Sequence, residues 1–236
     1  MDPNLARWHL QATLFVVACL CALGVAPTSA QVAPSRAEAA LYKGLHAAAY
    51  AGNATEIEQL AATADLNARD RNGRTPLHVA TFARQRNALR ALVKAGANID
   101  LLDKDRYDGV TIASVADDEE TLRVLLSLGA SAKQVTSRYD GTALIAAAHL
   151  GHDGVVRQLI AAGAPLDHVN NLHWTAAIEA VVLGDGGPRH QATLKALIDA
   201  GAKLQLADRQ GSTPLQLARA RGYTAMVQML EKAGAR

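Results

Sequence analysis

Residues 73–80 read Gly-Arg-Thr-Pro-Leu-His-Val-Ala, and residues 211–218 repeat the pattern as Gly-Ser-Thr-Pro-Leu-Gln-Leu-Ala. The same register recurs in six places, each with an apolar or small residue at the equivalent position: Leu45, Leu77, Val110, Leu144, Ala177 and Leu215. The spacings between these positions run from 32 to 38 residues. A regular period in this range indicates a stacked array of repeats, which usually presents a surface for a partner and seldom carries chemistry.

The fourth repeat shows most clearly what each unit encodes. Asp140-Gly141 is a turn-forming pair, and Thr142 can cap a helix with its side-chain oxygen. An alanine-rich segment follows as far as Gly151, where a helix can end in the left-handed conformation. Apolar residues at positions 155, 156, 159 and 160 then give a second helix one buried stripe. Each unit is therefore predicted to be a turn and two short helices, without real strands.

This unit resembles the ankyrin repeat. Residues 73–80 match the family pattern Gly-x-Thr-Pro-Leu-His-x-Ala in full, and residues 211–218 differ from it only at Gln216. Lys43 and Asp108 depart from it by standing where the family has threonine. The resemblance implies an all-α ankyrin-repeat solenoid of about six helix-turn-helix repeats with short β-turn tips. Their predicted bounds are 41–69, 70–102, 103–136, 137–169, 170–207 and 208–236.

The small residues of the repeats have a packing reason. Closely stacked helices leave little room between their backbones, and alanine recurs at one position of every unit. The members of this column are Ala48, Ala80, Ala113, Ala147, Ala180 and Ala218. We expect the column to lie where neighbouring repeats meet, because no single repeat can bury its own apolar face.

The first 30 residues do not fit the array. Arg7 precedes an apolar stretch at positions 14–26, and Thr28-Ser29-Ala30 offers a small-residue cleavage site, so we expect a secretory signal peptide cleaved after Ala30. Two alternatives remain open: an uncleaved membrane anchor, or lipidation at Cys19. Residues 31–40 are expected to be a short tether. The N-terminus is of bacterial type, so the periplasm is the expected compartment.

Composition and motifs argue against several classes of function. The formal net charge is +2 and no basic stripe interleaves with aromatic residues, so no nucleic-acid partner is expected. Phosphate-loop, nucleophile-elbow and His-Glu-x-x-His motifs are absent from the sequence. No catalytic residue, cofactor or metal is therefore expected, and neither is membrane insertion once the signal peptide is removed.

The resemblance places the turn tips and the exposed side of each first helix on one concave face. Rigid aromatic side chains favour interface centres, so Phe82, Tyr107, Tyr139 and Trp174 suggest a binding groove there. The alternative is that the tip aromatics pack on neighbouring turns. The complete set of candidate partner-binding residues is Asn72, Arg74, Phe82, Tyr107, Tyr139, His149, Leu172, His173, Trp174 and Arg189.

Two further features allow a different interpretation. Residues 184–190 add a glycine-rich insertion to the fifth repeat, which is either a tolerated extension or a projecting contact loop with Arg189 and His190 at its tip. His149, His152 and His173 could approach one another, and imidazole clusters bind metals. The competing hypothesis is therefore a metal- or small-molecule-binding protein, or an enzyme, that uses these histidines and the insertion.

The sequence favours a non-enzymatic protein–protein interaction scaffold, expected to be a monomer in the bacterial envelope. Two roles fit it equally: an accessory factor for an envelope or stress enzyme, or an immunity protein that blocks the active site of a toxic effector.

Overall fold

The structure is a computed structural model that describes residues 33–236. The predicted signal peptide, its cleavage site and the possible lipidation at Cys19 lie outside these residues. The described part forms one compact unit, built from thirteen short helices and a single pair of two-residue strands.

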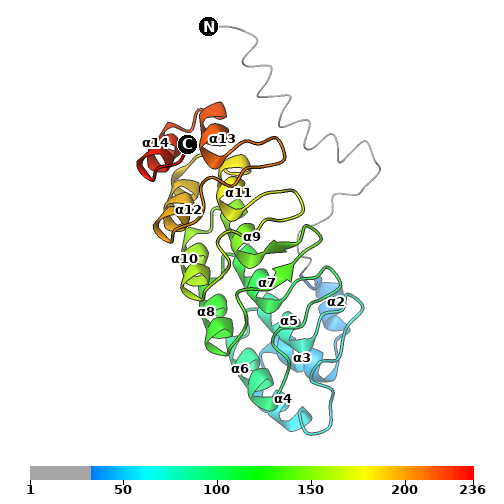
Figure 1. Cartoon of the computed structure of the whole chain (residues 1–236). Helices are drawn as coiled ribbons and strands as arrows, with labels where there is room; N and C mark the ends of the chain where they lie inside the picture. Colours follow the sequence, from blue (N-terminus) through cyan, green and yellow to red (C-terminus); the bar gives the residue numbers. More distant parts are fainter. Residues whose placement is uncertain (1–32) are drawn as a thin grey trace, which may run out of the picture. The chain divides into compact units, whose positions relative to one another are not determined.

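Six helix pairs, one for each predicted repeat, form two parallel ladders (Figure 1). The inner helices are α3 (Gly44–Ala51), α5 (Pro76–Phe82), α7 (Gly109–Val115), α9 (Ala143–Leu150), α11 (Ala176–Val182) and α13 (Pro214–Ala220). The outer helices are α4 (Ala54–Leu60), α6 (Arg86–Ala95), α8 (Glu119–Ser127), α10 (Asp153–Ala161), α12 (Pro188–Asp199) and α14 (Thr224–Lys232). Each helix packs against its own partner and against the equivalent helix of the next repeat. The predicted solenoid is confirmed.

The inner helices begin where the motif threonines predict. The side-chain oxygens of Thr75, Thr142, Thr175 and Thr213 each accept a hydrogen bond from the backbone N–H three residues later. This satisfies one of the N–H groups that a helix start leaves unpaired. In the divergent third repeat Asp108 takes over the role, and its Oδ1 accepts from the Thr111 N–H at 2.7 Å. The third repeat therefore keeps a capped inner helix without the threonine.

The alanine column lies between the inner helices, as the packing argument predicts. All six side chains are at most 1% exposed, and they join one continuous core with buried leucine, isoleucine and valine residues from the outer helices. Backbones that approach this closely leave no room for a longer side chain.

The structure differs from the predictions at two places. Residues 31–40, expected to be a tether, contain helix α2 (Arg36–Ala40), which begins with a capping box between Ser35 and Glu38. The link between the third and fourth repeats, expected to lack strands, contains β1 (Val135–Thr136) and β2 (Gly141–Thr142). These pair antiparallel, with Val135 opposite Thr142 and Thr136 opposite Gly141.

We expect that replacing Ala147 with Leu destabilises the protein by ~1–3 kcal/mol, because the larger side chain overpacks the space between α9 and its neighbours. The free energy of unfolding, measured by urea denaturation, checks this. Ala161→Leu is the control, because Ala161 is exposed on outer helix α10. Equal stability of the two variants would show that the inner column is not closely packed.

A second prediction concerns His78, whose Nδ1 accepts from the Thr75 N–H at 3.1 Å. Burial lowers the pKa of His78 from its ordinary 6.5 to about 4. Between these values the unfolded chain binds a proton that the folded chain does not, so stability falls as the pH drops through this window.

We expect the substitution His78→Gln to flatten this pH dependence. Gln216 stands at the equivalent position of the last repeat, where its Oε1 accepts from the Thr213 N–H at 2.8 Å, so glutamine preserves the cap. Unfolding midpoints measured above pH 6.5 and near the lower end of the window give the comparison. An unchanged pH dependence in the variant would assign the effect to other groups.

Candidate protein-binding surface

Five turns project side by side beyond the inner helices (Figure 1), and we call them the finger row. They comprise residues 70–74, 103–107, 136–141, 170–174 and 208–212. Four of them share one internal design, in which the first side chain accepts hydrogen bonds from the backbone N–H groups two and four residues later. Asp70, Asp103, Asn170 and Asp208 are these acceptors, at 2.8–3.0 Å. The turns are therefore held rigidly by their own side chains.

Hydrogen bonds also join each turn of the row to the next. The Lys104 N–H donates to the Asn72 carbonyl at 3.0 Å, and the Ser137 N–H donates to the Arg106 carbonyl at 2.9 Å. Asn171 continues the series: its N–H donates to the Tyr139 carbonyl at 2.9 Å, and its own carbonyl accepts from Arg209 Nη2 at 2.6 Å. The row is thus one connected surface, and a partner would meet it already ordered.

The predicted aromatic residues differ in how far they project. Tyr139 is 41% exposed, and Leu172 on the adjacent turn is 37% exposed. Tyr107 and Trp174 are half-buried within the row, and burial raises the pKa of Tyr107. Phe82 is half-buried at the end of α5. Tyr107 and Trp174 therefore pack partly against the array, while Tyr139 presents a large side chain to solvent; binding by these residues stays a prediction.

Arg74 does not belong to the exposed surface on which the sequence placed it. Its side chain is buried; Nε donates to Asp70 Oδ2 at 2.7 Å and Nη2 lies 3.0 Å from Glu38 Oε1. Asn72 remains exposed, although its Nδ2 also donates to Glu38 Oε1, at 2.8 Å. Arg74 therefore anchors helix α2 to the second repeat.

The carboxylate of Asp70 stands at the centre of this anchor. Burial raises its pKa, but hydrogen bonds from the Tyr42 hydroxyl at 2.8 Å and from Arg74 outweigh burial and lower the pKa below its ordinary value. Asp70 is therefore an ionised acceptor at neutral pH that fixes the turn, the arginine and the tyrosine together.

A buried carboxylate that sequence reasoning missed lies beneath His149 on the concave side. Glu179 on α11 is 5% exposed; its Oε2 lies 3.3 Å from His149 Nδ1, and its Oε1 accepts from Asn170 Nδ2 at 2.9 Å. Aligning the repeats could have found it, because the equivalent positions of α5 and α7 hold Val79 and Ile112. An acidic residue at an apolar position marks a polar contact.

The three histidines of the metal hypothesis take part in separate contacts. His149 faces Glu179, while His152 Nδ1 lies 2.9 Å from the Ser114 carbonyl oxygen. His173 is an exposed turn residue with a left-handed backbone, φ 64°. Within residues 33–236 no group of three or more His, Cys, Asp or Glu side chains is placed to hold a metal ion. The structure therefore offers these histidines no shared ligand set.

The glycine-rich insertion is tied to the repeats on both sides. Arg189 Nη2 lies 2.7 Å from Asp117 Oδ2 of the third repeat, and Tyr223 of the sixth donates from its hydroxyl to the Gly184 carbonyl at 2.9 Å. His190 Nδ1 lies 2.9 Å from Asp185 Oδ1, and its Nε2 lies 3.0 Å from the His149 carbonyl oxygen. Arg189 and His190 therefore turn back onto earlier repeats, and neither forms a free projecting tip.

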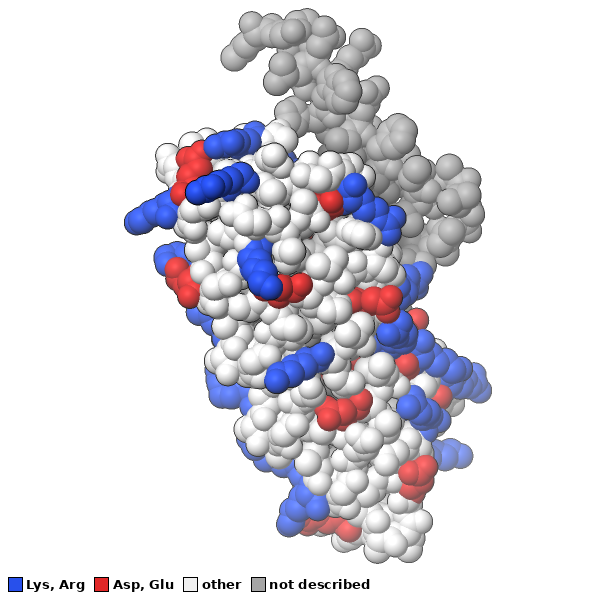
Figure 2. Space-filling model, in the orientation of Figure 1, with Lys and Arg blue, Asp and Glu red and all other residues white. Residues whose placement is uncertain are grey.

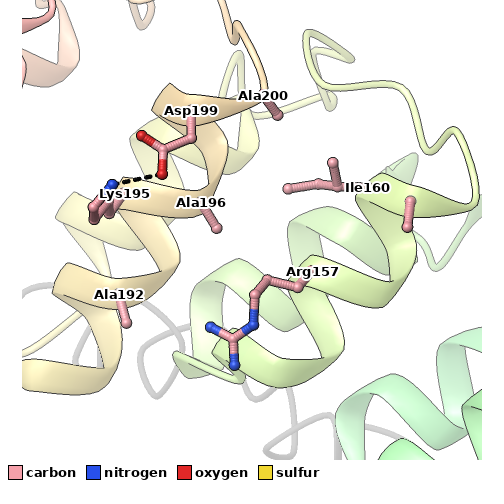
Figure 3. Close-up of a pocket in the computed structure, with 8 residues that line it drawn as sticks. Arg157, Ile160, Ala192, Lys195, Ala196, Asp199 and Ala200 are labelled. Carbon is pink, nitrogen blue, oxygen red and sulfur yellow. Dashed lines mark hydrogen bonds and ion pairs between the residues drawn. The ribbon is translucent and has the colours of Figure 1, made fainter.

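A shallow groove of about 450 Å³ lies away from the finger row, between the outer helices α10 and α12 (Figure 3). Alanines and Ile160 form its apolar lining, with Arg157 and Lys195 at its rim. Arg157 Nη1 lies 2.7 Å from Asp153 Oδ2, and Lys195 Nζ lies 2.6 Å from Asp199 Oδ2. Because these cations already have carboxylate partners and the lining holds no Ser, Thr, Cys or His, the groove presents no chemistry of its own.

None of the helices formed by residues 33–236 has the length and apolar character required to span a bilayer. This finding covers only the described part of the chain, so the N-terminal apolar stretch lies outside it.

Comparison with known proteins agrees with this architecture. A family model described as ankyrin repeats in three copies matches residues 32–103 and 110–208. The Escherichia coli K12 ankyrin repeat protein YahD is 37% identical over 177 residues, which is 75% of this chain and 88% of that protein. A crystal structure of an ankyrin repeat domain from Acinetobacter baumannii AYE is 42% identical with a TM-score of 0.76, covering 81% of this chain and 98% of that one.

The likeness extends to a more distant solved structure. The ankyrin repeat domain of Bcl-3, described as a member of the IκB protein family, is 27% identical with a TM-score of 0.74, covering 83% of this chain and 88% of that one. The resemblance inferred from the Thr-Pro-Leu-His motif is confirmed, because the family model accounts for more than half of the sequence. The chain belongs to the ankyrin repeat family.

Proposed function

We propose that this protein is a non-enzymatic scaffold that binds another protein through its concave face, formed by the finger row and the exposed side of the inner helices. Ankyrin repeats generally mediate protein–protein interactions. The observation that carries the assignment to this face is the pair Tyr139 and Leu172, which are exposed on adjacent turns joined by a hydrogen bond. Large apolar groups on a rigid frame bind at a low cost in conformational entropy.

The N-terminal sequence supports an exported protein that acts in the bacterial envelope, with the periplasm as first choice. Fractionation of cells that express the full chain, followed by N-terminal sequencing, tests this. A mature form that starts at Gln31 supports cleavage after Ala30. A membrane-bound chain with the intact N-terminus would identify an anchor, and a lipidated Cys19 would identify a lipoprotein.

Two roles fit a scaffold of this kind: an accessory factor that supports an envelope or stress enzyme, and an immunity protein that blocks a toxic effector. The activity of the captured partner separates them. An accessory factor leaves or raises that activity, whereas an immunity protein abolishes it in a stoichiometric complex. Light scattering of the purified chain tests the expected monomer in the same preparation.

We expect Tyr139→Ala to weaken partner binding by ~1–3 kcal/mol, which is about a fivefold to 150-fold rise in Kd, because the ring would be a central contact of the interface. Partner capture from envelope extract, followed by titration calorimetry with the purified partner, provides the measurement. Leu172→Ala should act in the same direction. Both residues are surface-exposed, so the unfolding midpoint should change little.

Arg123→Ala on outer helix α8 is the control, because this side chain is exposed on the opposite ladder and makes no ion pair within residues 33–236. Affinity reduced by Arg123→Ala but not by Tyr139→Ala would move the interface to the outer helices. Affinity unchanged in all three variants would reject both surfaces.

A further inference from the structure

The charges of the finger row are arranged with the acids turned inward. Three of its aspartates, Asp70, Asp103 and Asp208, accept backbone N–H groups of their own turns. Asp140 Oδ1 lies 2.8 Å from Arg106 Nη1. Asp105 is exposed without an ion-pair partner among residues 33–236, whereas the partly exposed Asp140 is paired with Arg106. Most carboxylates of the row are thus engaged in hydrogen bonds or an ion pair within the turns themselves.

The cations of the row point the other way. Four of them are exposed and have no carboxylate within ion-pair distance among residues 33–236: Arg71, Lys104, Arg138 and Arg209. Two make only single bonds to turn carbonyls, from Lys104 Nζ to the Arg71 oxygen and from Arg209 Nη2 to the Asn171 oxygen. Figure 2 shows Lys and Arg side chains projecting along the edge where the turns lie. Their positive charge is available to a partner.

These cations flank the exposed apolar centre of the row. Arg138 directly precedes Tyr139 in the chain, and Arg209 reaches the turn that carries Leu172 through its bond to Asn171. Arg71 and Lys104 extend the positive charge toward the first repeats. An apolar centre with a charged margin is the general anatomy of a protein-binding surface, and the sign of the margin selects the partner.

We propose that the finger row binds an acidic protein segment in extended conformation, whose carboxylates pair with Arg71, Lys104, Arg138 and Arg209 while its apolar side chains contact Tyr139 and Leu172. The proposal rests on the scaffold function and names its partner class. Neighbouring turns of packed helices are ~10 Å apart and a strand rises ~3.3 Å per residue, so about 12 residues span the row from Arg71 to Arg209.

A protein segment fits these features better than other anionic partners. Nucleic acid without sequence preference requires a groove of cations with rings for base stacking, and Tyr139 is the one aromatic residue of the row that projects strongly into solvent. A lipid surface would require apolar residues that insert, whereas the apolar centre here is small. An acidic segment supplies both kinds of contact when carboxylates and apolar side chains share the face of the strand that meets the row, which holds every second residue.

The test uses the full chain and a fluorescein-labelled peptide of the length derived above, in which every second residue is Glu or Leu in turn and the residues between them are Ser, so that both types share one face of the extended peptide. Fluorescence anisotropy is expected to show saturable binding that weakens as salt is added, because the contacting charges are exposed. A matched peptide with Gln in place of Glu should bind about tenfold more weakly or worse. No binding of the acidic peptide, or equal binding of the two peptides, would overturn the proposal.

Two triple variants with the same change in net charge locate the site. The finger variant combines Arg71→Glu, Arg138→Glu and Arg209→Glu. The outer variant combines Arg90→Glu, Arg123→Glu and Lys232→Glu, all exposed on the outer helices. The finger variant should lose acidic-peptide binding about tenfold or more, and the outer variant should change it much less. Equal losses would reduce the effect to overall charge and contradict a specific row.

The single variant Arg138→Glu covers the case in which the triple variant misfolds. It should fold normally, because no hydrogen bond or ion pair of the Arg138 side chain occurs within residues 33–236. It should weaken binding while the thermal unfolding midpoint stays unchanged. Phosphatidylserine vesicles and a single-stranded oligonucleotide serve as competitors. Stronger binding of either than of the peptide, lost in the finger variant, would assign the row to a lipid surface or to nucleic acid and reject the acidic segment.

Binding of the natural partner to the Tyr139→Ala variant and to the finger variant distinguishes failure of this proposal from failure of the scaffold function on which it rests. If Tyr139→Ala loses the partner while the finger variant retains it, the scaffold stands and the acidic class is wrong. If the finger variant loses both the partner and the acidic peptide, the two proposals hold together.

Discussion

The close approach of the inner helices is the constraint on which the rest of this structure depends. No single repeat encloses a core, so every unit must bury its face against its neighbours, and the alanine column sets how near they come. That distance brings the turns of consecutive repeats within hydrogen-bonding reach. The finger row is rigid because the helices beneath it are close.

The carbonyl groups of the turns need hydrogen-bond partners that apolar packing cannot supply. Polar side chains provide them. His46 Nε2 lies 3.0 Å from the Arg74 carbonyl oxygen, His78 Nε2 the same distance from that of Tyr107, and His168 Nε2 2.6 Å from that of Asp140. The contacts of His46 and His78 each join one repeat to the next, whereas His168 and Asp140 lie at the two ends of the fourth repeat. Gln216 at the equivalent position of the sixth repeat keeps the cap within its own repeat. Histidine occupies this position in the first two repeats, and the next three have Thr111, Ile145 and Ile178 there.

Sequence periodicity predicted the parts of the fold that repeat, and failed where a residue acts outside its repeat. Thr75 and Thr213 cap the helices they were expected to cap, because that signal is local. Arg74 was expected beside Phe82 in the binding groove, but it is buried and pairs with Glu38 of a helix outside the periodic pattern. The start of that helix does have a local sequence signal, because Ser35 and Glu38 stand three residues apart as a capping box requires.

The candidate surface was predictable in outline for a related reason. The family pattern shows which positions form the turn tips, but not how far each side chain emerges, because exposure depends on the neighbouring turn. Tyr139 projects from a turn held by a two-residue strand pair, whereas Tyr107 and Trp174 are half-buried. The position of the 184–190 insertion was unpredictable for the same reason, because Arg189 pairs with Asp117 of the third repeat, across the intervening fourth repeat.

The charge asymmetry of the finger row follows from the chemistry of its turns and is not an independent feature. A tight turn with a left-handed residue needs acceptors for its backbone N–H groups, and aspartate supplies them by folding its carboxylate inward. The residues at the apex have no such task, and here they are largely arginine and lysine. A surface built this way turns positive without raising the net charge of the chain, which remains +2. The proposed selectivity for an anionic partner therefore rests on where the charges point, and the overall composition of the protein gives no sign of it.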